Sequence, residues 1–452
     1  MAGSVYSEEF QSLLKDTIEK ERSMPVKKVK VNRKTVTVPT PYPSPIDWRD
    51  HWIYFVMIDR FNNPDPHLPP RSTLQGTYWD GPFGDFQGGT LNGITDKLDY
   101  IKSLGATAIW ITPPFKNCPY EKTYYGYGIQ NFLSIDPRFG TEKDLQSLVD
   151  QAHARGMYVI FDIVLNHTGN IFKYIDKDGN AVNEAPWQDQ EYDIRWLDKD
   201  GNVKSSEPIS CGPDECIWPS ELQNNKYFRR KGIFKPGNEL QGDFSWLKEM
   251  VTEYVDGLNY YPVRDILIKS YQYIIAKFDI DGFRIDTLKY IERPFSMAFG
   301  NAVREFALSI GKKNFFTFGE VWDSENKIAG YVGRYTSDED GIIGVDAALD
   351  FPLYYSLPGA IKGLNPPSDI VKMFEERKRQ EKEIIGYHGE AGKFFVTFLD
   401  NHDKGGELAE RFYFWSKDHA YDNQVSIGVG ALFTLQGIPC LYYGTEQGLH
   451  GF

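Results

Sequence analysis

Short apolar runs alternate with segments of helical periodicity from Trp52 onward. Eight of the apolar runs have the length expected of buried strands, at 53–58, 107–112, 157–164, 282–286, 314–320, 347–351, 394–399 and 438–443. Between most of them, apolar residues recur every three or four positions, which predicts amphipathic helices, for example over 91–101, 145–152 and 266–278. Apolar strands joined by helices form parallel sheets that are buried on both faces, so the pattern predicts an α/β fold.

Eight strands with helical connections predict a closed (β/α)8 TIM barrel. A doubly wound open sheet has the same alternation of elements and is the alternative that periodicity leaves open. One connection is unusual, because almost 100 residues separate the third run from the helix that starts near Pro262. Connections of this length are functional or form a small domain of their own. We therefore expect a barrel in two parts, 46–167 and 247–452, with an inserted domain at 168–246.

Residues 1–45 precede this alternating pattern. They carry a short amphipathic helix, a basic β-prone stretch at 26–38 and a proline-rich stretch at 39–45. We interpret them as an N-terminal appendage that packs on the barrel or links to it. At the other end, few residues follow the eighth apolar run. A barrel without its last helix would expose an apolar face, so we expect that helix to lie outside this chain.

Composition narrows the functional classes. Of the 452 residues, 41% are apolar and 25% are charged, which is typical of a globular protein and excludes a wholly disordered chain. The net charge is −13, whereas binding to nucleic acid or to an anionic membrane needs clustered cations. We therefore expect neither partner. Aromatic residues reach 15%, and the excess fits a flat, half-apolar ligand such as a sugar ring.

The cysteines and the apolar stretches give information about the cellular location of the protein. Cys211 and Cys216 flank Gly-Pro-Asp-Glu and form either a local disulfide or two free thiols. Residues 1–35 contain acidic residues and lysines but no apolar signal core, so the default expectation is a cytoplasmic protein, or a secreted one if the opening residues replaced a leader. The uncharged stretch 425–444 contains Gln436 and Pro439, which predicts a buried helix, a turn and a strand instead of a membrane span.

Polar side chains gather at the ends of four predicted strands. They lie at 162–167, 284–289, 320–323 and 400–403. The carboxyl ends of the strands form the active-site face of a (β/α)8 barrel. Asp and Asn at a single strand end could equally form a turn. Four such ends on one rim predict a site lined with carboxylates.

These four clusters resemble, in the same order, the four signature regions of the α-amylase family, glycoside hydrolase family 13. Segments beginning at Asp59, Gly88 and Gly437 are similar to this family too, so the resemblance runs from about Trp52 to Gly448. It implies that the long insertion is the family's domain B and that a C-terminal β domain is not in this chain. It also implies a retaining hydrolase that cleaves α-1,4-glucosidic bonds in starch or maltooligosaccharides through a covalent glycosyl-enzyme.

The resemblance assigns roles to three carboxylates. Asp286 matches the catalytic nucleophile, Glu320 the general acid/base and Asp403 the carboxylate that steadies the transition state. A retaining glycosidase needs two carboxyl groups about 5–5.5 Å apart, one to attack the anomeric carbon and one to transfer protons. Arg284 stands two residues before Asp286 on the same strand face, so we expect it to hold Asp286 ionised. A purely structural salt bridge inside the barrel is the alternative for Arg284.

Further residues match substrate contacts of the family. His167, His402 and Lys289 lie within the signatures, and Tyr127 stands where a tyrosine stacks on the sugar. The alternative for Tyr127 is aromatic core packing. The chain departs from the usual pattern at three positions near these contacts, namely Tyr125, Gly128 and Tyr290.

Calcium is the cofactor that the resemblance suggests. Asn166 matches a family ligand between the barrel and domain B, and Asp243 resembles a second one. A calcium ion needs six to eight oxygen ligands, whereas Asn and Asp in loops also serve as turn formers. We therefore predict Asn166 and Asp243 as the metal ligands.

Three functional readings follow, all for a protein that we expect to be a monomer with an α-glucan or maltooligosaccharide substrate. The first is the α-amylase-like hydrolase. The second is an α-glucanotransferase or exo-α-glucosidase of the same family that uses the same carboxylates. The third is a non-catalytic glucan-binding protein on the same fold, which the presence of all three carboxylates disfavours.

Overall fold

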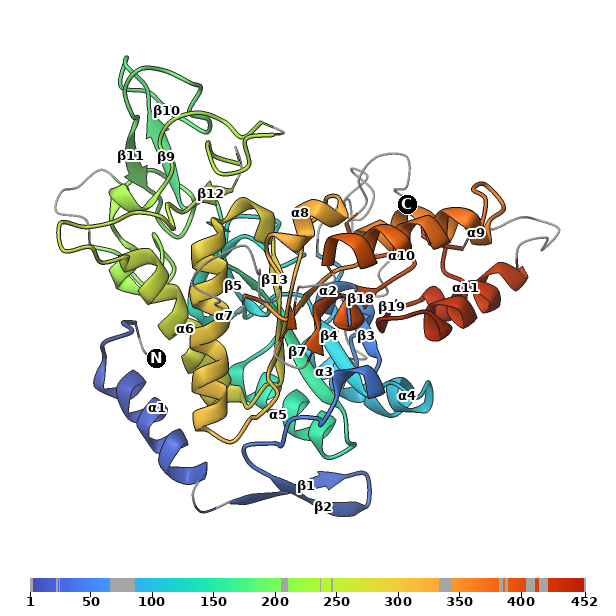
Figure 1. Cartoon of the computed structure of the whole chain (residues 1–452). Helices are drawn as coiled ribbons and strands as arrows, with labels where there is room; N and C mark the ends of the chain where they lie inside the picture. Colours follow the sequence, from blue (N-terminus) through green and yellow to red (C-terminus); the bar gives the residue numbers. More distant parts are fainter. Residues whose placement is uncertain are drawn as a thin grey trace.

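The computed structural model describes residues 3–21, 23, 25–65, 86–204, 210–235, 237–244, 247–332, 344–381, 385–386, 389–403, 411–413 and 422–450. Its centre is a sheet of eight parallel strands in the order β15, β14, β13, β7, β4, β3, β19 and β18 (Figure 1). Their bounds are β3 Ile53–Val56, β4 Ala108–Ile111, β7 Tyr158–Val164, β13 Gly282–Asp286, β14 Phe316–Gly319, β15 Ala347–Ala348, β18 Val396–Thr397 and β19 Ile438–Tyr442. Each predicted apolar run contains one of these strands.

The sheet closes on itself. Each strand lies beside the next one along the chain, and β19 pairs with β3. A parallel bridge between Leu349 and Val396 joins the two edges of the sheet. The predicted (β/α)8 barrel is therefore confirmed, and this strand order excludes the doubly wound open sheet.

Helices cover the outside of the barrel (Figure 1). The α-helices are α2 Ile58–Phe61, α3 Leu91–Asp96, α4 Leu98–Ser103, α5 Glu142–His153, α6 Pro262–Phe278, α7 Arg293–Ser309, α8 Glu325–Ala329, α9 Phe351–Ile361, α10 Ser368–Glu381 and α11 Asp422–Thr434. Short 3-10 helices lie at Trp48–Asp50, Ser220–Leu222, Asn225–Tyr227, Leu288–Tyr290, Ala391–Phe394 and Thr445–Gln447. One predicted helix, 91–101, is in fact two helices, because the backbone leaves helical geometry at Lys97.

Local chemistry explains where α5 begins and ends. The Thr141 hydroxyl accepts a hydrogen bond from the backbone of Asp144, whose carboxylate accepts one from the backbone of Thr141. Gly156 follows the helix with a φ of 67°, a left-handed conformation that favours glycine. The helix thereby returns the chain to the amino end of β7.

Aromatic rings fill the barrel below its carboxyl end. Phe55 of β3 stacks on Trp110 of β4 with ring centroids 3.7 Å apart, and Phe318 of β14 meets the edge of Trp110 at 5.6 Å. Trp110 also donates a hydrogen bond from Nε1 to Asp162 Oδ2 at 3.1 Å. This packed layer supports the polar residues above it.

The long connection after β7 forms a separate projection (Figure 1). Its strands are β8 His167–Thr168, β9 Phe172–Ile175, β10 Ala181–Val182, β11 Asp193–Trp196 and β12 Lys248–Glu249. Strands β10, β9 and β11 form a three-stranded sheet, and β12 pairs with β8 at the barrel. Cys211 and Cys216 form a disulfide with an S–S distance of 2.07 Å, which decides between the two states open from the sequence. The limits 168–246 stay a prediction, and Trp246 lies outside the described residues.

The N-terminal segment lies against the lower part of the barrel (Figure 1). It consists of α1 Glu8–Glu21 and a hairpin of β1 Val26–Val31 and β2 Lys34–Pro39. Phe10 of α1 stacks on Tyr273 of α6 with ring centroids 4.6 Å apart.

Two further hairpins are β5 Phe115–Asn117 with β6 Ile129–Ile135, and β16 Ile385–Gly386 with β17 Gly389–Glu390. Among the helices described, none has the length and apolarity needed to span a membrane.

Candidate active site

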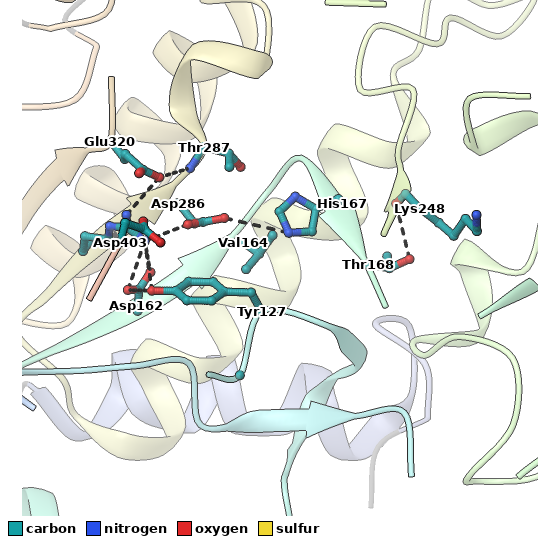
Figure 2. A network of polar contacts seen from close by, with 12 residues as sticks. Tyr127, Asp162, Val164, His167, Thr168, Lys248, Asp286, Thr287, Glu320 and Asp403 are labelled. Carbon is teal, nitrogen blue, oxygen red and sulfur yellow. Dashed lines mark hydrogen bonds and ion pairs between the residues drawn. The ribbon is translucent and has the colours of Figure 1, made fainter. Parts of the chain in front are cut away.

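Arg284 of β13 is the centre of a buried polar cluster at the carboxyl end of the barrel. Its side chain has no exposed surface, and Nη1 lies 2.8 Å from Asp286 Oδ1 and 2.9 Å from Asp162 Oδ1. Nη2 lies 2.9 Å from Glu320 Oε2. Figure 2 shows the carboxylates of Asp162, Asp286, Glu320 and Asp403 gathered in one place. The structure therefore brings the three predicted catalytic carboxylates together around the predicted arginine.

The barrel register explains this meeting. Arg284 pairs with Asp162 across the β13–β7 ladder, and residues two apart on a strand point to the same face. Arg284 and Asp286 therefore both point into the barrel. Glu320 follows directly after β14, where its backbone N–H bonds Ile285 O at 2.8 Å. Gly319 is required before it, because a Cβ there would lie 2.0 Å from a methyl group of Leu288.

Thr287 binds the predicted acid/base through its backbone. Its φ of 48° is left-handed, which is uncommon for a residue with a branched side chain. In this conformation the Thr287 N–H donates to Glu320 Oε2 at 2.9 Å. Backbone strain of this kind persists where the surrounding structure holds it and is frequent at active sites. The sequence carries no signal for this contact, so it was missed there.

The cluster holds more negative than positive charge. Burial raises the pKa of Asp286 well above its usual value, and the neighbouring Glu320 adds to the effect while Arg284 opposes it. Burial likewise raises the pKa of Asp162 to about 7. Loss of water raises the pKa of Asp403, whereas Arg284 and a hydrogen bond with the Glu320 side chain lower it.

Tyr127 and His402 extend the cluster. The Tyr127 hydroxyl donates to Asp162 Oδ2 at 2.7 Å and lies 2.6 Å from His402 Nε2. Their rings are nearly parallel, with centroids 5.4 Å apart. Tyr127 is only 8% exposed, and its hydroxyl is part of the internal network. Its predicted stacking on a sugar stays a prediction.

His167 and Lys289 lie at different distances from the carboxylates. His167 Nε2 is 3.8 Å from Asp286 Oδ2, and burial lowers the pKa of His167 to about 4. Lys289 Nζ donates to the Trp322 carbonyl at 2.9 Å and lies 3.8 Å from Asp323 Oδ2. His167 thus adjoins the predicted nucleophile, whereas Lys289 is held at the segment that follows Glu320. Both roles in substrate binding stay predictions.

The predicted metal ligands do not form an oxygen cage. Asp243 Oδ2 accepts hydrogen bonds from the Tyr174 hydroxyl and, at 3.1 Å, from Lys248 Nζ. Its Oδ1 accepts one from the Glu249 N–H at 2.8 Å. The side-chain nitrogen of Asn166 is buried and has no hydrogen-bond partner among the described residues. Hydrogen-bond donors therefore occupy the carboxylate that calcium would need, and the residues as arranged do not fit the ion.

Two other observations delimit the site. Among the described residues, no group of three or more His, Cys, Asp or Glu side chains is arranged to hold a metal ion. A cavity of about 620 Å³ lies in the insertion, where it is lined by residues that include Trp187, Arg230 and Tyr254. None of the four carboxyl groups around Arg284 lines this cavity. The carboxyl cluster around Arg284 therefore lies in the barrel and is separate from this cavity.

Known proteins share this architecture. The family model described as alpha amylase, catalytic domain, matches residues 42–452. An alpha-amylase of Streptomyces lividans is 31% identical over 81% of this chain and 41% of its own length. A cyclomaltodextrin glucanotransferase of Klebsiella oxytoca is 25% identical over 90% of this chain and 59% of its own length. This chain thus spans less than two thirds of either relative.

A solved structure agrees with these relatives. The alpha-amylase of Geobacillus thermoleovorans, complexed with acarbose, superposes with a TM-score of 0.61 and 29% identity, covering 90% of this chain and 73% of that one. The fold, the order of the four strand-end clusters and the family match agree. The chain therefore belongs to the alpha-amylase family, and residues 42–452 correspond to its catalytic domain.

Proposed function

We propose that this protein is a retaining glycosidase that hydrolyses α-1,4-glucosidic bonds in starch or maltooligosaccharides. The observation that carries the proposal is that Asp286 and Glu320 contact the two terminal nitrogens of a single guanidinium, that of Arg284. One planar group thereby holds the two carboxylates side by side. A nucleophile and an acid/base at short separation are what a double-displacement mechanism needs.

Each residue of the cluster has a chemical task in this mechanism. Asp286 attacks the anomeric carbon, while Glu320 gives its proton to the leaving glycosidic oxygen. Arg284 favours the charged form of Asp286, which burial opposes, and its other terminal nitrogen holds Glu320 beside the nucleophile. Glu320 then removes a proton from the water that attacks the glycosyl-enzyme. The mechanism requires a charged nucleophile and a protonated acid, and the cluster places the two carboxyl groups for these roles in one site.

Two histidines are suited to hydrogen bonding with sugar hydroxyls. Burial lowers the pKa of His167 to about 4 and that of His402 to about 3. Both rings are thus neutral at the pH of most glycosidase assays, and a neutral ring both donates and accepts hydrogen bonds. A neutral glucan needs no further charge for recognition.

The test is an assay on soluble starch and maltooligosaccharides with purified full-length chain. We expect new reducing ends, with the first product released as the α-anomer in a proton NMR time course. Glu320→Gln should abolish turnover, whereas the matched control Glu191→Gln, at a largely exposed position paired with Arg230, should retain it. Intact starch with the unaltered chain, or a β-anomer as first product, would exclude the proposal.

A second candidate is glycosyl transfer by the same carboxylates. A cyclomaltodextrin glucanotransferase is among the relatives, and a group of three half-buried rings reaches His167 through one of its members. Phe244 lies 5.4 Å from the His167 ring, and Phe234 and Tyr290 each lie within 6 Å of Phe244. Such rings could hold an acceptor sugar in place of water. Longer or cyclic products from maltotetraose, quantified by chromatography, would favour transfer over hydrolysis.

A further inference from the structure

Lys248 is a fully buried cation at the junction between the insertion and the barrel. Neither its side chain nor that of Asp243 has any exposed surface, and Lys248 Nζ lies 3.1 Å from Asp243 Oδ2. The ammonium also donates to the Asn183 carbonyl at 2.9 Å. A lysine is almost never buried completely unless such partners replace its water.

Aromatic rings complete the cage around this ammonium. Lys248 Nζ lies 4.4 Å from the ring centroid of Tyr174 and 5.3 Å from that of Phe172, both on β9. A cation over an aromatic face is attracted to it, most strongly where water is absent. The Tyr174 hydroxyl in turn bonds the other partner, Asp243. The contacts of Lys248 therefore connect its own strand, β12, to β9, to the backbone at Asn183 and to Asp243.

The Asp243 carboxylate is paired with a cation without an added ion. Asp243 and Glu249 are both buried at this junction, and each contacts a cation, although Arg229 also contacts Glu253 at 2.6 Å. Lys248 pairs with Asp243, and Arg229 Nε lies 3.3 Å from Glu249 Oε1. A metal ion added beside Asp243 would meet an ammonium already in contact with the carboxylate. One of the two residues that the resemblance suggested as calcium ligands therefore already contacts a covalently attached cation.

The same strand connects Lys248 to the catalytic cluster. In the β12–β8 ladder, Lys248 pairs with Thr168 and Glu249 pairs with His167. The Asn166 carbonyl, next to β8, accepts a hydrogen bond from Met250 N at 2.8 Å. Figure 2 shows Lys248 and Thr168 on one side of His167 and Asp286 on the other. His167 belongs to β8, the partner strand of β12, and lies 3.8 Å from Asp286. A displacement of β12 would therefore change the position of His167 relative to the predicted nucleophile.

We propose that Lys248 is the resident cation of this junction, replacing a structural metal ion, and that through the β12–β8 pair it positions His167 against Asp286. It is a positioning residue, because it acts on the site through His167. The metal-replacement part stands on the geometry of the junction alone. The positioning part rests on the proposed function.

The first test measures metal content and stability, so it does not depend on activity. The purified full chain is stripped with EDTA and compared in 1 mM CaCl₂ and 1 mM EDTA by calorimetry and by isothermal titration with Ca²⁺. We expect the same Tm in both buffers and no binding at this junction. Lys248→Ser leaves the Asp243 carboxylate without a cation, so its Tm should fall and should recover in part with Ca²⁺.

The matched control is Lys199→Ser, an exposed lysine of the same insertion, which should behave like the unaltered chain. The outcome that overturns the metal-replacement part is one Ca²⁺ bound per unaltered chain, with a Tm gain that Asp243→Asn removes. If Lys248→Ser does not fold, the titration of the unaltered chain and of Asp243→Asn still decides this part.

The second test separates positioning from stability. The activities of Lys248→Met and Lys248→Arg are measured well below the Tm of each variant. We expect kcat of Lys248→Met to fall about tenfold, because small displacements near a reacting group are costly, with a smaller change in KM. Lys248→Arg should recover most of this loss. An unchanged kcat in a folded Lys248→Met would overturn the positioning part, whereas inactivity of the unaltered chain on every glucan would instead refute the proposed function.

Discussion

Arg284 in the barrel and Lys248 in the insertion are both fully buried cations, but the charges around them differ. Arg284 contacts three carboxyl groups, on Asp162, Asp286 and Glu320, without a second cation in the cluster as described. Lys248 contacts one, on Asp243. A buried excess of carboxyl groups retains protons, which acid/base chemistry needs, whereas a balanced pair only holds structure. Burial and charge alone therefore do not distinguish these two sites, whereas the number of carboxyl groups around each cation does.

The largest expected effect comes from removing Glu320, the proposed proton donor of the Arg284 cluster. Glu320→Gln keeps the shape of the side chain but cannot exchange a proton. We expect kcat on maltooligosaccharides to fall by about 10³-fold or more. Stability should change little in comparison, because Gln can still accept the Thr287 N–H bond. A folded Glu320→Gln variant with more than a tenth of the original kcat would contradict the assigned role.

Removing the buried cation should have different effects in the barrel and in the insertion. Arg284→Met leaves the surrounding buried carboxyl groups uncompensated and should lower the free energy of unfolding by about 3–5 kcal/mol. Arg284 lowers the pKa of Asp286, so its loss should also move the acid limb of the pH–activity profile to higher pH. Lys248→Met should lower stability without moving that limb. Urea unfolding and pH profiles check both, and an unmoved acid limb in Arg284→Met would argue against the shared cluster.

A smaller effect concerns the pH dependence of stability. Burial lowers the pKa of His402 to about 3, whereas an unfolded histidine titrates near 6.5. The unfolded chain therefore binds the proton first, and the stability from this residue is lost as the pH falls from about 6.5 toward 3. At pH 5 the loss is about 2 kcal/mol. His402→Gln should show a correspondingly flatter dependence in urea unfolding, and equal slopes would contradict the burial argument.

The smallest effect is expected from the disulfide of the insertion. Cys211 and Cys216 are only five positions apart, so the bond removes little entropy from the unfolded chain. The double variant Cys211→Ser/Cys216→Ser should lose about 2 kcal/mol or less. Its kcat should equal that of the unaltered chain, because neither cysteine contacts the carboxylate cluster. A large loss of kcat would show that the insertion and the site are coupled more widely than through Lys248.

The sequence predicted the barrel well because its signals are local. Each of the eight apolar runs contains a strand, and the four polar strand ends meet because parallel strands share one edge. Seven of the eight strands are shorter than their runs, and two runs, 53–58 and 347–351, end in the first residues of helices α2 and α9. The break at Lys97 was missed because apolar residues on both sides keep one helical face.

Contacts between distant segments could not be predicted in this way. The partners of Asp243 include Tyr174, which is 69 positions away, and the backbone of Thr287 reaches Glu320 only because it turns left-handed. A sequence motif also identifies the type of a residue but not the residues that surround it in the folded protein. Asp243 matched a calcium ligand, whereas the cation beside it comes from Lys248, five positions further along the chain.

The central claim is that Asp286 forms a covalent bond to the sugar within the Arg284 cluster. The most direct measurement uses Glu320→Gln with α-maltosyl fluoride, a donor whose leaving group needs no protonation. The variant should accumulate a glycosyl-enzyme, because it lacks the base that activates water. Peptide mass spectrometry should then find one maltosyl unit on the peptide that contains Asp286. A label on another carboxylate, or release of the β-anomer with no labelled enzyme, would contradict the account.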